Sequence, residues 1–178
     1  KTLAKATDLL ERGYKRLIGF EASQKGYEWF GSNPGHEGLT AYGLMEFNDM
    51  KKAGQAVDQT MLDRTSTWLM SHKDGKGGFA REKHAYHDFG RISDDILNAY
   101  IVYALAEAGY SDFKKEFNTS FDKAIASKDP YMLAMMANAA YSLKENTKGD
   151  EAMKALMSKQ QKDGGFNGLT HSITYSQG

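Results

Sequence analysis

The sequence contains no cysteine, and this absence excludes several kinds of chemistry within its 178 residues. Without a thiol there are no disulfides, no cysteine-ligated zinc sites and no thiol nucleophile. No apolar run is long enough to cross a membrane. Because basic and acidic residues both number 23, the zero net charge gives no reason to expect nucleic acid or an anionic membrane as a partner.

A recurring loop is the main positive feature of the sequence. WLMSHKDGKGGFA (68–80) reappears as ALMSKQQKDGGFNG (155–168), and a looser copy, GFEASQKGYEWFG, covers 19–31. Each copy ends a helical pattern and places an aromatic residue after glycine. These aromatics are 52 positions apart (27 to 79) and 87 positions apart (79 to 166), which is room for one and two helical hairpins. Such self-similarity predicts stacked supersecondary units.

The predicted helices are of two kinds. One kind is amphipathic, as in the stripe formed by Ala6, Leu9, Leu10, Tyr14 and Leu17. The other kind is apolar on nearly all sides and is therefore expected to be buried. It covers 39–47, 96–110 and 131–143.

Strand signals are almost absent, so we predict an all-α fold. Outer amphipathic helices alternate with inner apolar ones, which favours an α/α toroid of antiparallel helical hairpins. A straight solenoid is the alternative, because hairpins of this length also build HEAT-like stacks. The chain supplies three to four of the roughly six hairpins that close such a ring. We therefore expect an incomplete arc whose apolar ends promote self-association.

Four segments together resemble the thioester domain of the alpha-macroglobulin and complement proteins, with the bacterial-type or macroglobulin-like members the most similar. They are GYEWFGSNPGHEGLTAYGLMEF (26–47), DGKGGFAR (74–81), DILNAYIVYALAEAG (95–109) and KDGGFNGLTHSITYSQG (162–178). The DGGF loops alone are less specific, since terpene cyclases and protein prenyltransferases also have them. Those enzymes need an acid-rich run or a cysteine-containing zinc site, and this sequence has neither.

The resemblance implies a function for a longer parent protein. Family members carry a Cys-x-Glu-Gln motif whose Cys and Gln side chains form an internal thioester, and the motif precedes the region seen here. We therefore expect residues 1–178 to be a partial domain that lacks this motif and the last hairpins. The parent is expected to trap proteases or attach covalently to target surfaces outside the cytoplasm. We expect it to need no cofactor and not to be a turnover enzyme.

The resemblance also suggests a role for one histidine. In complement members, a histidine eight positions after the aromatic of the second loop assists acyl transfer, and here that position is His87. An imidazole could form an acyl intermediate or act as a base for a hydroxyl nucleophile. His84, His87 and Asp88 could instead hold a metal, or could belong to a solvated loop.

Other polar residues have two interpretations each. His36 and Glu37 could line the ring mouth as binding residues, or could cap the start of a helix. Asp94 and Asp95, with Tyr100 and His87, could serve a toroidal lyase or glycosidase, whereas Ser93 before them indicates ordinary N-terminal capping.

The aromatic residues of the loops also have two interpretations. Trp29, Phe30, Trp68, Phe79 and Phe166 could stack on carbohydrate, or could fill the space between hairpins. A helical-repeat binding scaffold is a further alternative for the whole chain.

Overall fold

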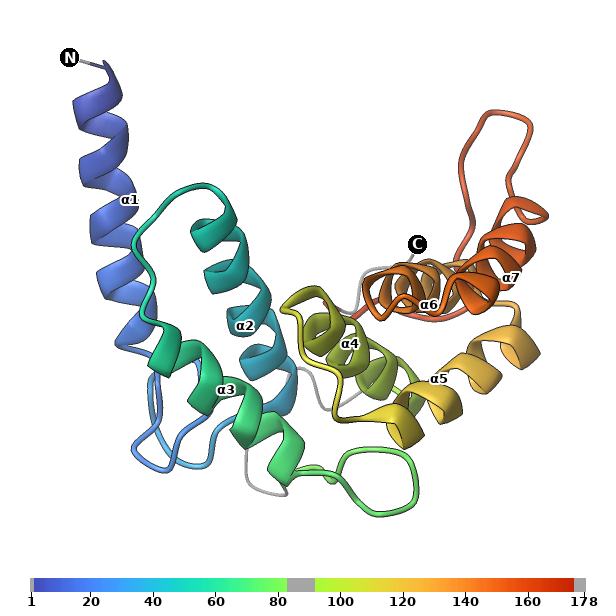
Figure 1. The fold of residues 1–178 in the computed structure, drawn as a ribbon, viewed down its shortest axis with the longest axis horizontal. Coiled ribbons are helices and arrows are strands. Elements are labelled where there is room, and N and C mark those ends of the chain that lie inside the picture. The colour runs from blue at the N-terminus through green and yellow to red at the C-terminus, as the bar shows by residue number, and fades with distance from the viewer. Residues whose placement is uncertain (1, 83–91, 175–178) are drawn as a thin grey trace.

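The computed structural model describes residues 2–82 and 92–174, which form seven α-helices and no β-strand (Figure 1). The helices are α1 (Thr2–Ile18), α2 (Glu37–Lys52), α3 (Gln59–Ser71), α4 (Asp94–Glu107), α5 (Lys114–Ser127), α6 (Pro130–Ser142) and α7 (Asn146–Met157). The predicted all-α fold is confirmed. No helix among these residues is long and apolar enough to span a membrane.

The helices are arranged in two layers. α2, α4 and α6 form the inner layer, in which α4 packs against both α2 and α6. α3, α5 and α7 form the outer layer, and each packs against the inner helix that precedes it in the chain. The helix axes change direction from one hairpin to the next (Figure 1). The alternation of outer and inner helices is therefore observed, while closure into a ring stays a prediction for the larger domain.

α4 is the centre of the core. From residue 96 to residue 107 it has no exposed residue, because α2, α5 and α6 cover it on three sides. Ala99, Ala104 and Ala106 have almost no accessible surface, and their small side chains let neighbouring helices approach closely. The prediction of a helix buried on all sides is confirmed here.

The same prediction is wrong for the two flanking inner helices. Tyr42 of α2 is 52% exposed, and Tyr141 of α6 is 39% exposed. The cause is their position, since each has an inner neighbour on one side only, namely α4.

α1 contains no buried residue, although its sequence is strongly amphipathic. Leu3, Leu9 and Leu10 are 81%, 52% and 48% exposed. Only the last turns of α1 join the core, where the ring of Tyr14 meets that of Phe47 edge-on at 5.9 Å. The apolar stripe expected to face inward therefore lies mostly open.

The three loops share one backbone hydrogen bond, as the sequence repeat predicts. An amide three or four positions after the last residue of the preceding helix donates to the carbonyl of the glycine just before the loop aromatic. These bonds join Ala22 to Gly26 (2.9 Å), Asp74 to Gly78 (3.0 Å) and Gln161 to Gly165 (2.8 Å). Donors and acceptors follow the same offsets of 52 and 87 positions as the aromatics.

The loop aromatics differ in burial. Phe79 is 6% exposed and fills space between hairpins as expected, as does Tyr27 at 5%. Trp68 is half-buried against the core. Phe30 and Trp29 are 78% and 45% exposed, so the space-filling prediction is wrong for them. Phe166, at 36%, has no later inner helix among the described residues to cover it.

Gly26 lies where the first loop packs closely against the Trp68 ring. Its φ of 74° is left-handed, and a Cβ there would lie 2.7 Å from Cε2 of Trp68. We expect Gly26→Ala to lower the free energy of unfolding by about 1–2 kcal/mol for the backbone, with a further ~1–3 kcal/mol for the clash. Urea unfolding measures both.

Gly54→Ala is the matched control, because Gly54 has a φ of 90° but no atom within 4 Å of an added Cβ. It should show the backbone cost alone. Equal losses in the two variants would contradict the close contact with Trp68.

Candidate functional site

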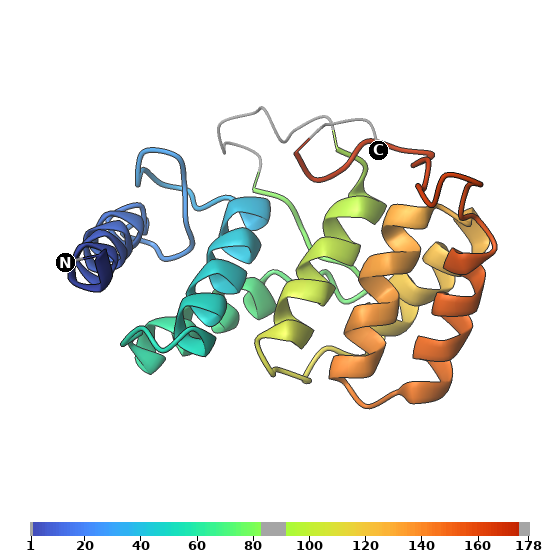
Figure 2. The ribbon, with the colours of Figure 1, turned by 90° about the horizontal axis from the view of Figure 1, so that it is seen from above.

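The amino-terminal ends of α2, α4 and α6 lie along one edge of the molecule, which we call the loop face (Figure 2). It consists of residues 20–36, 79–82 and 158–174 together with the first turns of these three helices. His36, Glu37, Asp94 and Asp95 lie at this edge, at the starts of α2 and α4.

His36 caps α2. Its Nδ1 accepts hydrogen bonds from the amides of Gly38 (3.0 Å) and Leu39 (3.4 Å), and its side chain is nearly buried. An Nδ1 that accepts from two amides carries no proton, so protonation of this nitrogen would remove the cap. The capping alternative is thus observed, and a binding role at the ring mouth stays a prediction.

The buried Glu37 carboxylate links two segments of the loop face. Its side chain is 2% exposed, and Oε1 accepts a 2.6 Å hydrogen bond from the amide of Glu82. Burial raises the pKa of the Glu37 carboxyl, because desolvation disfavours its charged form. The contact joins the start of α2 to the segment that follows the second loop.

Asp129 likewise links the start of α6 to a distant segment of the loop face, and its side chain is fully buried. Oδ1 accepts from the amides of Tyr131 and Met132, so Asp129 is the N-cap of α6. Oδ2 accepts from the amide of Leu169 and from Oγ1 of Thr170, at 2.8 and 3.1 Å. Sequence analysis missed this second pair of contacts, because no local pattern links residues 40 positions apart.

Asp94 and Asp95 lie in the first turn of α4, behind the predicted cap Ser93. Oγ of Ser93 caps α4 by accepting from the amide of Ile96. Asp94 then forms an ion pair with Arg81 at 2.7 Å, whereas Asp95 pairs with Lys123 of α5. The carboxylates are therefore engaged by cations from different elements, as expected for charges in the first turn of a helix.

The remaining polar candidates lie apart from these acids or outside the described residues. Tyr100 is buried in α4, and burial raises the pKa of its hydroxyl. His84, His87 and Asp88 lie outside the described residues. Within the residues that are described, no three His, Asp or Glu side chains are placed to hold a metal ion.

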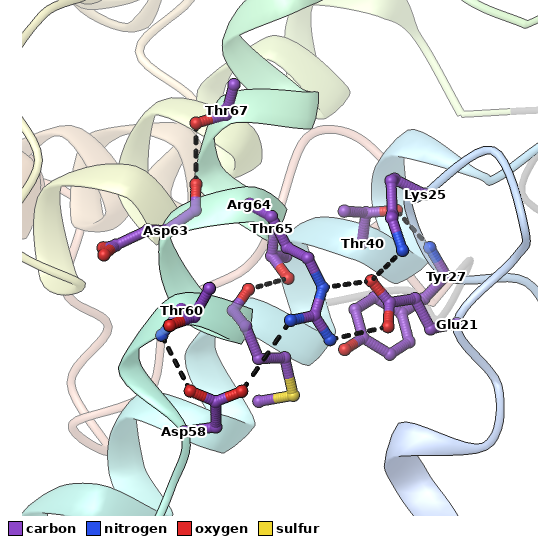
Figure 3. Close-up of polar contacts among 11 residues, drawn as sticks. Glu21, Lys25, Tyr27, Thr40, Asp58, Thr60, Asp63, Arg64, Thr65 and Thr67 are labelled. Atoms are coloured by element: carbon purple, nitrogen blue, oxygen red, sulfur yellow. Dashed lines mark hydrogen bonds and ion pairs between the residues drawn. The ribbon is translucent and has the colours of Figure 1, made fainter.

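An ionic network holds the first loop, which leads into His36, against α3 (Figure 3). Arg64 of α3 donates two hydrogen bonds to Glu21, at 2.6 and 2.8 Å, and lies 3.8 Å from Asp58. The Arg64 guanidinium holds the pKa of the Glu21 carboxyl below its ordinary value.

The same loop is tied to α2 through Tyr27. Its amide donates to Oγ1 of Thr40 at 2.8 Å. The buried ring lies beside that of Phe47, with the ring centres 5.5 Å apart, and burial raises the pKa of the Tyr27 hydroxyl to about 12. The first loop thus contacts the second turn of α2 as well as α3.

Comparison with known proteins identifies the family. A family model described as the A-macroglobulin TED domain, the thioester domain, matches residues 1–172. The chain therefore belongs to the alpha-macroglobulin thioester-domain family. The resemblance stated from the sequence is confirmed.

A solved structure agrees at the level of the fold. The native conformation of alpha-2-macroglobulin from E. coli, determined by cryo-EM, superimposes with a TM-score of 0.64 at 17% sequence identity. The match covers 83% of this chain and 9% of that chain, so our chain spans less than a tenth of the length of that protein.

The Arg64–Glu21 pair makes stability depend on pH. Because the folded-state pKa of Glu21 lies below its unfolded value, the pair stabilises fully above the unfolded pKa, and this contribution is lost as the pH falls through the folded pKa. We expect Glu21→Gln to cost about 1 kcal/mol at pH 7, and the gap from the wild type to shrink below roughly pH 4. Urea unfolding across pH measures it.

Glu11→Gln serves as the control, because Glu11 also pairs with a cation, Lys15, but on the exposed surface of α1. Its effect at pH 7 should be smaller. A gap for Glu21→Gln that stays constant down to pH 2 would show that the ion pair does not stabilise the fold.

Proposed function

We propose that this chain is part of the thioester domain of an alpha-macroglobulin-like protein, whose parent traps proteases or attaches covalently to targets. The observation that carries the proposal is the family match over residues 1–172. The chain has no cysteine, so the thioester belongs to a Cys-x-Glu-Gln motif outside these 178 residues. Proteases or target surfaces are partners of the parent, and its other domains contact this one.

The helical core supports this proposal physically. Exclusion of water protects a reactive thioester from hydrolysis, and a domain with an apolar helical core of the kind formed around α4 is suited to that role. Release then follows a change in the shape of the parent, in the manner of other switches that free a stored reactive group. Each thioester reacts once, so the parent is an inhibitor or a tag rather than a turnover enzyme. It acts outside the cytoplasm.

The lyase or glycosidase alternative has less support. It requires carboxylates that converge on a cleft, whereas Asp94 and Asp95 pair with separate cations. Two surface pockets, one beside α1 and α2 and one beside α6 and α7, are lined by neither carboxylate.

The thioester is tested by weighing the longer polypeptide. A version extended upstream through any Cys-x-Glu-Gln motif should gain the mass of one methylamine and release one free thiol when treated with methylamine. Intact mass spectrometry and thiol titration measure the two changes. The same version with the motif cysteine replaced by alanine is the control. No adduct in the intact motif would overturn the proposed function.

His87 is tested in that same polypeptide. If the His87 imidazole assists transfer to hydroxyls, His87→Ala should reduce labelling by glycerol while labelling by methylamine continues. His84→Ala is the matched control and should leave the ratio of the two products unchanged. Equal losses for both nucleophiles would argue against a role for His87 in choosing between them.

A further inference from the structure

The glycine loops contain three pairs in which an aspartate or asparagine precedes glycine, and the structure sets one of them apart. The pairs are Asp74-Gly75 in the second loop, and Asp163-Gly164 and Asn167-Gly168 in the third loop, residues 158–168. In such a pair the glycine nitrogen can attack the preceding side-chain carbonyl carbon, because glycine has no Cβ to hinder the approach. Hydrogen bonds that hold either group in place oppose this attack.

The aspartate of the second loop is held in this way. Oδ1 of Asp74 accepts from the amides of Gly78 and Lys76, at 3.0 and 2.6 Å. The hydrogen bond from the Gly78 amide holds the pKa of the Asp74 carboxyl below its ordinary value. The group therefore stays a carboxylate, which a nitrogen nucleophile attacks poorly.

The aspartate of the third loop is also engaged. Oδ1 of Asp163 accepts from the amide of Gly165 at 3.0 Å. The amide of Gly164, which would be the nucleophile, donates to the carbonyl of Gln161 at 2.9 Å. Both reacting groups of this pair thus have a partner within the loop.

Asn167-Gly168 differs from the other two pairs. The third loop extends beyond the end of α7 (Figure 1), and Asn167 is exposed and lies outside any helix. Neither the Asn167 side chain nor the Gly168 amide forms a hydrogen bond to a described residue. An amide that only water binds can lose its proton and act as a nucleophile.

This pair lies directly before the anchor of the third loop. Leu169 donates its amide to Oδ2 of the buried Asp129 at 2.8 Å, and Thr170 donates its hydroxyl to the same oxygen at 3.1 Å. The main chain at residue 167 therefore leads straight into the contact that ties the loop to α6. A change in the length of the main chain at residue 167 must alter that contact.

We propose that Asn167 is a site of spontaneous deamidation, and that its isoaspartate product loosens the contact of Leu169 with Asp129. The Gly168 nitrogen bonds to Cγ of Asn167, and the side-chain nitrogen leaves as ammonia with the proton that Gly168 gives up. Water then opens the succinimide ring. Cleavage of the bond from Cγ to nitrogen gives aspartate, and cleavage of the main-chain bond gives isoaspartate.

The two products have different effects on the anchor. Aspartate adds a negative charge but keeps the length of the main chain. Isoaspartate runs its main chain through Cβ and is one carbon longer, so it displaces the Leu169 amide from Asp129. The reaction needs only water and involves no thioester, so this inference goes beyond the proposed function.

The first test stores the 178-residue chain in mildly alkaline buffer made with water enriched in heavy oxygen. Peptide mass spectrometry should find Asn167 converted to aspartate and isoaspartate that carry one solvent oxygen. Asn146 is the matched control, because it is also exposed but precedes Thr147, whose branched side chain hinders the attack. Conversion of Asn167 in the folded chain should run within about threefold of that in guanidinium chloride, since folding holds neither reacting group.

The second test measures hydrogen exchange at the Leu169 amide. The isoaspartate fraction, separated by chromatography, should exchange about tenfold faster than the fresh chain, because its anchor opens more often. Asn167→Asp, which supplies the charge alone, should stay within about twofold of the fresh chain. Asn167→Gln, which closes the ring far less readily, should keep the fresh rate after the same storage.

Two results would overturn the site itself. One is conversion of Asn167 that is no faster than that of Asn146, and the other is conversion that folding slows by more than about tenfold. Unchanged exchange at Leu169 in the isoaspartate fraction would overturn the effect on the anchor. The methylamine experiment can fail without affecting these results, because it concerns a motif outside the chain.

Discussion

The structure depends on the burial of α4 between α2 and α6. The alanines and branched side chains of α4 have almost no accessible surface, so α2, α4 and α6 pack closely together. Each outer helix then packs against the inner helix that precedes it in the chain. Removing apolar area of this extent from water is the dominant favourable term in folding. Everything on the loop face is positioned by this contact, since the first turns of the inner helices carry His36, Ser93 and Asp129.

Much of the fold could be predicted from the sequence because the signals are local. Periodicity distinguished outer from inner helices, and the repeated loops gave the same hydrogen bonds at the predicted offsets. The cap at Ser93 was predicted from residue type alone. Exposure was harder to predict: Tyr42 and Leu10 belong to apolar stripes, yet whether a stripe is covered depends on neighbours that periodicity does not specify.

The candidate site was predicted less completely, for a related reason. His36 was recognised as a possible cap, but the contact of Glu37 with residue 82 joins two separate hairpins and has no sequence signal. Likewise, Asp94 and Asp95 look like a pair in the sequence, whereas adjacent helical residues point in different directions and meet different cations. Pairings of this kind follow from how the hairpins stack.

The carboxylates of Glu37 and Asp129 have a consequence for how such a domain tolerates evolutionary change. Both bind main-chain amides of a distant loop, at Glu82 and Leu169, and a main-chain amide is present whatever side chain the position bears. Substitution in the loops therefore leaves these anchors in place, except by proline. A loop face held in this way can diversify its chemistry while its backbone course is inherited, which is compatible with a shared fold at 17% identity.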